Sequence, residues 1–260
     1  MARRPRIDLI GYHHVSNQGV HKANLFATMI EKEEFLDMVC KACDIYDIVL
    51  HDYSIMDNHY HLLIETRREN LSYFMRQING NYAIHYNKKL DRGGPVWRGR
   101  YKSWYLMHEE YLDYTIKYIE YDPIKANVTF FPGDYPYTLS GAIFGQATVP
   151  SCSMESILIQ KYDKQELIEF LGSDLTRDEL GALEDEKRKK ITIEKKGVKL
   201  QRDVPLGEYF KDITSKQDRN LAMKKAYEDG YTQGQIAKHL NVTTALVSYS
   251  IKKLSESKSS

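Results

Sequence analysis

One stretch of nine residues decides the fold and raises the first question about function. It reads Asp57-Asn58-His59-Tyr60-His61-Leu62-Leu63-Ile64-Glu65. The apolar residues after the turn-forming pair Asp57-Asn58 predict a β-strand, on which side chains two positions apart point to the same face. His59 and His61 can therefore present both imidazole rings to one divalent metal ion. On spacing alone, two histidines held by packing and hydrogen bonds, without an ion, are the more common case.

A predicted helix further along the chain carries a stripe of tyrosines. Its apolar and aromatic positions recur every three to four residues, and Pro123 predicts that it ends near Asp122. Tyr118 and Asp122 are four residues apart and share one face with Tyr111 and Tyr114. A phenol and a carboxylate from this face could meet one metal ion, although most of the 20 tyrosines must be packing residues.

Five blocks of sequence stand in order along the first half of the chain. They are Gly11-Tyr12-His13-His14-Val15, residues 57–66, residues 70–83, Arg98-Gly99-Arg100-Tyr101-Lys102 and residues 118–126. In this order the blocks resemble those of the REP-associated tyrosine transposases, which are single-tyrosine members of the HUH superfamily of single-strand DNA nucleases. Five ordered blocks make a far more specific likeness than one pair of histidines.

The resemblance implies a role for individual residues. His59 and His61 match the paired metal ligands of the family, and Tyr118 matches the nucleophile of its Tyr-Ile-x-x-Asn-Pro element. Asp122 stands where the family usually has asparagine, at the position that resembles a third metal ligand. A carboxylate should hold a divalent ion more tightly than an amide does, but its charge also offsets part of the attraction between the ion and an incoming phosphate.

Two other departures from the family pattern lie outside these ligands. Gln18 stands where relatives commonly have arginine, and Trp97-Arg98 replaces the usual Phe-Gln. Because the nucleophile and the histidines are kept, the resemblance implies a transposase that cleaves and rejoins single-stranded or hairpin DNA through a 5′-phosphotyrosine. It also implies Mg²⁺ or Mn²⁺ as the cofactor. The imidazole ligands by themselves favour Mn²⁺ over Mg²⁺, whereas the resemblance allows either ion. The identity of the metal is therefore left open between the two.

Two alternative functions are compatible with the same sequence. An HUH replication initiator would use the same nucleophile at an origin, although the close run of family blocks and the small size speak against it. A non-catalytic DNA-binding regulator could keep the fold without the activity, and Asp122 is the departure that favours this alternative.

The hydrophobic periods predict the element order βαββαβ, which is that of an α+β, ferredoxin-like antiparallel sheet with helices. We expect the strands at residues 7–15, 48–56, 59–66 and 102–107, and the helices at residues 32–46, 71–88 and 109–121. The predicted domains are an HUH transposase domain at 1–130, a linker and helical region at 131–215, and a helix-turn-helix domain at 216–260. The C-terminal region as a whole is predicted to be mainly α-helical.

A basic segment with interleaved aromatic residues predicts a surface for single-stranded DNA. Cationic side chains would meet the phosphates, and bases would stack on the rings. The alternative is a solvated loop that its aromatic residues anchor to the core. The candidate DNA-binding residues are Lys88, Lys89, Arg92, Trp97, Arg98, Arg100 and Lys102.

The last segment carries a second motif. Three helices are predicted at residues 218–229, 232–240 and 243–254, and their apolar residues are spaced as in a helix-turn-helix core. A three-helix bundle that binds another protein is the alternative. If the segment binds DNA, the residues at or near the start of its recognition helix are Thr243, Thr244, Ser248 and Tyr249.

Composition and cysteine content limit the remaining possibilities. A net charge of +1 argues against coating nucleic acid by bulk electrostatics, and no apolar run approaches the roughly 20 residues that span a bilayer. The first residues lack the apolar core of a secretory signal, so we predict a cytoplasmic protein without a membrane partner, either a monomer or a homodimer. Cys40 and Cys43 have no second pair to complete a zinc site and Cys152 is distant, so we interpret the two as small core residues.

Overall fold

The computed structural model describes residues 7–188, 191–194, 197–200, 205–211, 213, 215–228, 231 and 233–256. The chain divides into two compact units, Met1–Glu184 and Asp185–Ser260. None of the helices within the described ranges has the length and apolar character needed to span a bilayer.

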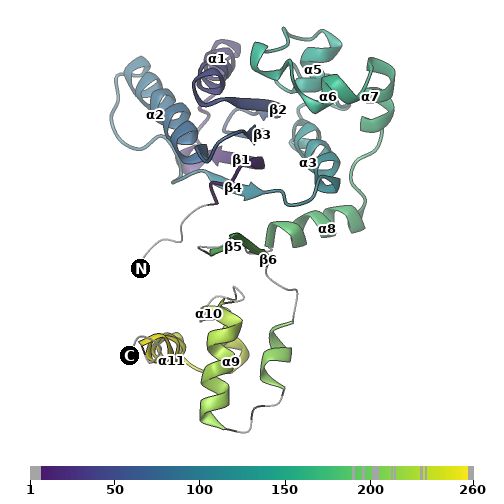
Figure 1. Ribbon diagram of the computed structural model, residues 1–260. Coiled ribbons are helices and arrows are strands. Elements are labelled where there is room, and N and C mark those ends of the chain that lie inside the picture. The colour runs from purple at the N-terminus through teal and green to yellow at the C-terminus, as the bar shows by residue number, and fades with distance from the viewer. Residues whose placement is uncertain are drawn as a thin grey trace. The chain divides into compact units, whose positions relative to one another are not determined.

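The first unit is built on a four-stranded antiparallel sheet (Figure 1). Its strands are β1 (Gly11–Gln18), β2 (Ile48–Ile55), β3 (His59–Thr66) and β4 (Lys102–Tyr105). The spatial order is β2-β3-β1-β4, so the histidine strand β3 lies inside the sheet between β2 and β1. The predicted α+β, ferredoxin-like antiparallel fold is confirmed.

Helices cover both faces of this sheet (Figure 1). Helices α1 (Met29–Tyr46) and α2 (Leu71–Lys89) pack on one face, and α3 (Glu110–Glu120) packs on the other. Alternate residues of β3 follow this division, as the pleat requires. Tyr60 packs against Phe35 of α1 with ring centroids 4.8 Å apart, whereas His61 faces Tyr118 of α3 at 5.6 Å.

Helix α3 ends where Pro123 predicts. Its last residue is Glu120, and a single further turn, α4 (Asp122–Lys125), begins at Asp122 with Pro123 in its first turn. Proline is tolerated in the first turn of a helix because the N–H that it lacks has no partner there anyway. The break places Asp122 at a helix start, two residues beyond the end of the tyrosine helix.

Elements after residue 130 complete the first unit. They are α5 (Leu139–Phe144), the 3₁₀ turn η2 (Ser151–Ser153), α6 (Ile157–Lys161), α7 (Lys164–Leu171) and the first part of α8 (Arg177–Arg188). A further 3₁₀ turn, η1 (Val20–Lys22), follows β1. Helices α5 and α6 contact β2, and every residue of β2 is buried. The sheet unit therefore continues past residue 130, and the division into three functional domains stays a prediction.

The interpretation of Cys40 as a core residue is wrong, because Cys40 forms a disulfide with Cys152. The bond joins α1 to η2 across 112 residues of sequence. Cys43 is buried with a free thiol, as predicted. Disulfides are rare in the reducing cytosol, so this bond and the predicted cytoplasmic location point in different directions.

Within its described residues, the second unit contains a hairpin, a 3₁₀ turn and three helices that follow them. The hairpin of β5 (Ile191–Glu194) and β6 (Gly197–Leu200) lies in a region predicted to be helical. The 3₁₀ turn η3 (Leu206–Phe210) packs with α9 (Lys216–Glu228), α10 (Gln233–His239) and α11 (Thr244–Glu256). The buried core of this bundle is made of small and medium-sized apolar residues, Met223, Ala226, Ile236, Ala237, Val247 and Ile251.

Candidate active site

The two histidines of β3 and the aspartate that begins α4 come together on the α3 face of the sheet. One possible ligand atom each from His59, His61 and Asp122 lies within 4.8 Å of the others. His59 Nε2 is 2.9 Å from Asp122 Oδ2. Two imidazole nitrogens and one carboxylate oxygen are a donor set that divalent first-row metals accept, so these residues fit the predicted ion.

Each histidine ring is oriented through its Nδ1 atom. His59 Nδ1 lies 2.6 Å from Asn58 Oδ1, and His61 Nδ1 lies 2.8 Å from Nε2 of His14 on β1. In both rings Nε2 is then the atom that can coordinate an ion. Partners of this kind fix the tautomer and the angle of a metal-binding histidine.

The carboxyl group of Asp122 is held in its ionised form. Burial favours the neutral acid, but the hydrogen bond with His59 and the charges of His61 and His59 outweigh it, and the pKa of Asp122 is lowered. Asp122 therefore offers a negatively charged oxygen at neutral pH.

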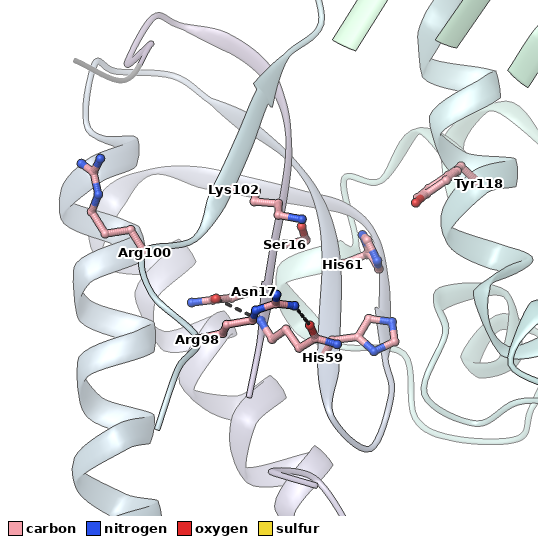
Figure 2. Close-up of a pocket in the computed structure, with 9 residues that line it drawn as sticks. Ser16, Asn17, His59, His61, Arg98, Arg100, Lys102 and Tyr118 are labelled. Atoms are coloured by element: carbon pink, nitrogen blue, oxygen red, sulfur yellow. Dashed lines mark hydrogen bonds between the residues drawn. The ribbon is translucent and has the colours of Figure 1, made fainter. Parts of the chain in front are cut away.

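The hydroxyl of Tyr118 points from α3 toward His61 (Figure 2). The ring makes edge contacts with His14 and His61 at centroid distances of 5.7 and 5.6 Å. Burial, together with the charges of Asp122 and Glu184, raises the pKa of Tyr118, so the side chain is a neutral phenol at physiological pH. Lys125 Nζ lies 5.5 Å from the centre of the same ring.

Among the three tyrosines of the predicted stripe, Tyr118 is the one that lines the cavity at this site. Tyr111 and Tyr114 instead contact each other, with ring centroids 6.1 Å apart.

The cavity beside these residues measures about 500 Å³ and is basic on one side (Figure 2). Its lining combines two of the three metal-ligand candidates, the tyrosine, three cations and three polar residues of β1: His59, His61, Tyr118, Arg98, Arg100, Lys102, Ser16, Asn17 and Gln18. Three of the seven predicted DNA-binding residues in the basic segment thus reach the site.

The two other departures from the family pattern contact each other. The guanidinium of Arg98 donates to Gln18 Oε1 at 3.3 Å, and the backbone N–H of Arg98 donates to the carbonyl of Gln18 at 2.8 Å. Gln18 also pairs with His59 in the sheet register. Gln18 therefore holds Arg98 at the edge of the candidate metal site.

The other predicted DNA-binding residues of this segment lie outside the cavity. Lys89 forms an ion pair with Glu31 at 3.1 Å, and Lys88 precedes it at the end of α2. Arg92 donates to the carbonyl of Pro95 at 3.3 Å. Trp97 donates to the Asn79 carbonyl at 2.9 Å and packs on the core, as the alternative interpretation of this loop predicts.

The sequence reasoning missed Asn58 and the contributions of β1. His14, Ser16 and Gln18 lie opposite Leu63, His61 and His59 in the antiparallel register and so share their face of the sheet. The two-residue spacing of His14, Ser16 and Gln18 could have indicated that these side chains share one face of a strand.

In the second unit, the predicted base-reading residues are exposed and lie on the last helix or directly before it. Thr243 precedes α11, and its Oγ1 accepts a hydrogen bond from the N–H of Leu246 at 3.3 Å. Thr244, Ser248 and Tyr249 are exposed, and Tyr249 is 64% accessible. The helix-turn-helix assignment stays a prediction.

Comparison with known proteins adds a family to this geometry. The family model described as "Transposase IS200 like" matches residues 8–122. The chain is similar to a solved REP-associated tyrosine transposase bound to a REP hairpin, with 12% identity, a TM-score of 0.48, and coverage of 56% of this chain and 87% of that one. It is also similar to a candidate transposase from Deinococcus radiodurans R1, with 15% identity, a TM-score of 0.33, and coverage of 49% and 98%. Comparison with curated proteins finds no match.

Proposed function

We propose that this chain is a metal-dependent DNA transposase with Tyr118 as its nucleophile, because residues 8–122 match the IS200-like transposase family model. One observation carries the proposal. Tyr118 lines one cavity together with His59 and His61, which cluster with Asp122, and the other side of this cavity is basic. A regulator without activity would have no use for a phenol directed at His61 beside two further metal-ligand candidates.

The three clustered residues would hold the ion, Mg²⁺ or Mn²⁺. When bound, a divalent cation supplies positive charge that polarises a phosphate oxygen and offsets the charge of Asp122. The residues themselves are arranged for this role without large movement, because β3 fixes the two histidines and the start of α4 fixes Asp122.

The covalent step is an in-line exchange at phosphorus. The Tyr118 oxygen forms a bond to the scissile phosphorus, the bond to the 3′-oxygen of the upstream strand breaks, and the phenol gives up its proton while the departing oxygen gains one. The products are a 5′-phosphotyrosine and a free 3′-hydroxyl. Because the phosphodiester energy is kept in the tyrosine ester, a 3′-hydroxyl can reverse the step and join strands without a nucleotide cofactor.

The basic side of the cavity is suited to the flanking phosphates. Arg98, Arg100 and Lys102 are exposed and line the same space as Tyr118. Their attraction for the backbone carries no sequence information, since phosphate contacts position a strand and base contacts specify it. We propose that selection of a hairpin or palindromic repeat depends on further contacts, including those of the exposed side of α11.

Replacement of Tyr118 by phenylalanine tests the nucleophile. The change keeps the ring and its contacts with His14 and His61 but removes the attacking oxygen. Wild-type protein with Mn²⁺ or Mg²⁺ and a hairpin oligonucleotide should form a covalent adduct with the downstream fragment, and Tyr118→Phe should form none while binding DNA normally. Tyr114→Phe is the matched control and should behave as wild type. Adduct formation by Tyr118→Phe would overturn the assignment.

Replacement of Ser248 and Tyr249 by alanine tests the role of α11. Both side chains are exposed, so the fold should be retained. Cleavage at high DNA concentration should persist, while the preference for cognate over unrelated DNA should fall at one fixed salt concentration. Unchanged affinity and preference would favour a partner-binding role for this bundle.

A further inference from the structure

We infer that His14 is a positioning residue that sets both the metal-binding histidine His61 and the nucleophile Tyr118. The inference rests on the proposed function, because it assigns to one side chain the alignment of two parts of that site. His14 belongs to β1, whereas the two groups it would align belong to β3 and α3.

The contacts of His14 connect the two groups directly. Its Nε2 lies 2.8 Å from His61 Nδ1, and its ring centroid lies 5.7 Å from that of Tyr118 in an edge-on arrangement. Trp104 of β4 packs against the ring at 5.8 Å. The side chain is 6% exposed, so its rotamer is set by packing.

The hydrogen bond selects the form of His61 that can hold an ion. A neutral imidazole carries its proton on one nitrogen and offers the lone pair of the other. If His61 donates from Nδ1 to Nε2 of His14, its own Nε2 presents a lone pair to the ion. If the bond ran in the opposite direction, the proton of His61 would sit on Nε2 and block coordination there.

The partner of His59 shows the same arrangement with a simpler group. Asn58 Oδ1 can only accept, so His59 must donate from Nδ1, and its Nε2 faces Asp122. His14 therefore does for His61 what Asn58 does for His59. It differs from Asn58 in also contacting Tyr118 through its ring.

Two substitutions separate the hydrogen bond from the ring contact. His14→Phe keeps an aromatic ring against Tyr118 and Trp104 but removes the acceptor for His61. His14→Gln places an amide oxygen near the original Nε2 and removes the ring. The matched control is His13→Phe, because His13 is the next residue of β1, is fully buried on the opposite face of the sheet, and bonds the carbonyl of Leu9 at 2.8 Å.

The first readout is the affinity of the full-length protein for Mn²⁺ without DNA, measured by the electron paramagnetic resonance signal of the free ion. We expect His14→Phe to bind Mn²⁺ about 10- to 100-fold more weakly than wild type, which is the usual cost of losing such a partner. His14→Gln and His13→Phe should bind Mn²⁺ within a few-fold of wild type. Wild-type affinity in His14→Phe would overturn the inference, and this readout stands whether or not the protein cleaves DNA.

The second readout is the rate of the covalent adduct at saturating Mn²⁺. His14→Gln should be slower than wild type, since the ring that positions Tyr118 is gone, and His14→Phe should recover most of the rate once the ion is saturating. Equal rates for His14→Gln and wild type would remove Tyr118 from the role of His14. If wild type forms no adduct but the Mn²⁺ pattern holds, the proposed function fails while the link between His14 and His61 survives.

A third measurement needs no variant and therefore no assumption about folding. Nitrogen-15 chemical shifts of the histidine rings in the metal-free wild-type protein report which nitrogen carries the proton. We expect His61 to be protonated on Nδ1. Protonation on Nε2 would overturn the inference.

Discussion

Two carboxyl groups at the end of α3 lie in opposite environments. Asp122 is hydrogen-bonded to His59 at the candidate metal site, and the pKa of its carboxyl group is lowered. Glu120, two residues earlier, is 1% exposed and accepts hydrogen bonds from the backbone N–H and the hydroxyl of Ser140 on α5. Burial raises the pKa of Glu120, although the bonds from Ser140 oppose this.

The buried carboxyl group of Glu120 lies beside a second buried acid, Asp52 of β2. Asp52 is fully buried, and burial together with the charge of Glu120 raises its pKa well above the ordinary value. The acid cluster of Asp52 and Glu120 therefore keeps a proton and ties the end of α3 to the sheet and α5. The difference teaches that one helix end can place a partly accessible carboxylate at a candidate metal site and a buried carboxylate in the packing of the fold.

Removal of the histidines should separate the two regions most clearly. His59→Ala and His61→Ala should each lower adduct formation by at least about 10²-fold, since metal-assisted charge stabilisation is worth several kcal/mol. The double variant should be hardly worse than either single one, because the ligands act as a unit. Denaturant unfolding should change little, as both side chains are partly accessible. Adduct formation by the double variant in chelator would exclude the proposed site.

The complementary change in the acid cluster is Glu120→Ala. It leaves the N–H and hydroxyl of Ser140 buried without their acceptor, at a cost of about 1–3 kcal/mol for each unsatisfied group. The free energy of unfolding should fall by roughly the sum of these two costs, while the Mn²⁺ affinity of the folded protein stays near wild type. Glu120→Gln, which keeps an acceptor, should lose less. A selective loss of Mn²⁺ affinity would mean that the two regions are not separate.

The protonation state of Asp52 predicts a specific pH dependence of stability. Its pKa is higher in the folded than in the unfolded protein, so folded molecules bind the extra proton, and stability falls as the pH rises above the unfolded value of about 3.9. The slope can reach about 1.4 kcal/mol per pH unit between the two pKa values. Asp52→Asn should flatten the unfolding free energy over this range. Asp37→Asn, at an exposed ion pair on α1, should not change the profile.

The smallest expected effect concerns the contact between Gln18 and Arg98. Arg98→Gln removes one cation from the cavity wall, so it should weaken single-strand binding and lower the dependence of log affinity on log salt by about one. The double variant Gln18→Arg with Arg98→Gln exchanges the two side chains and should restore affinity and slope. A double variant as weak as Arg98→Gln would show that the position of the charge matters more than its presence.

The sequence predicts the elements of this sheet and one part of the candidate site. Strand β3 and the start of α2 fall where the hydrophobic pattern places them, because local periodicity reports burial directly. The roles proposed for His59, His61, Asp122 and Tyr118 come from resemblance, and the structure brings all four side chains to one region.

What the sequence does not reveal are contacts that depend on register and tertiary packing. His14 meets His61 only because β1 and β3 pair in one particular antiparallel register. Glu120 has the sequence signature of an exposed helix residue, and only the packing of α5 buries it. Cys152 reaches Cys40 because a turn far along the chain folds back onto α1.

The disulfide between Cys40 and Cys152 has a consequence for proteolysis. The exposed loop at residues 91–95 lies between the two cysteines, which are 112 positions apart, and a protease could cut there after Arg92. The first fragment would carry both histidines, and the second would carry Tyr118 and Asp122. The disulfide would keep the two fragments covalently joined. A nicked molecule would therefore run as a single band on a denaturing gel without reductant, and as two bands after reduction.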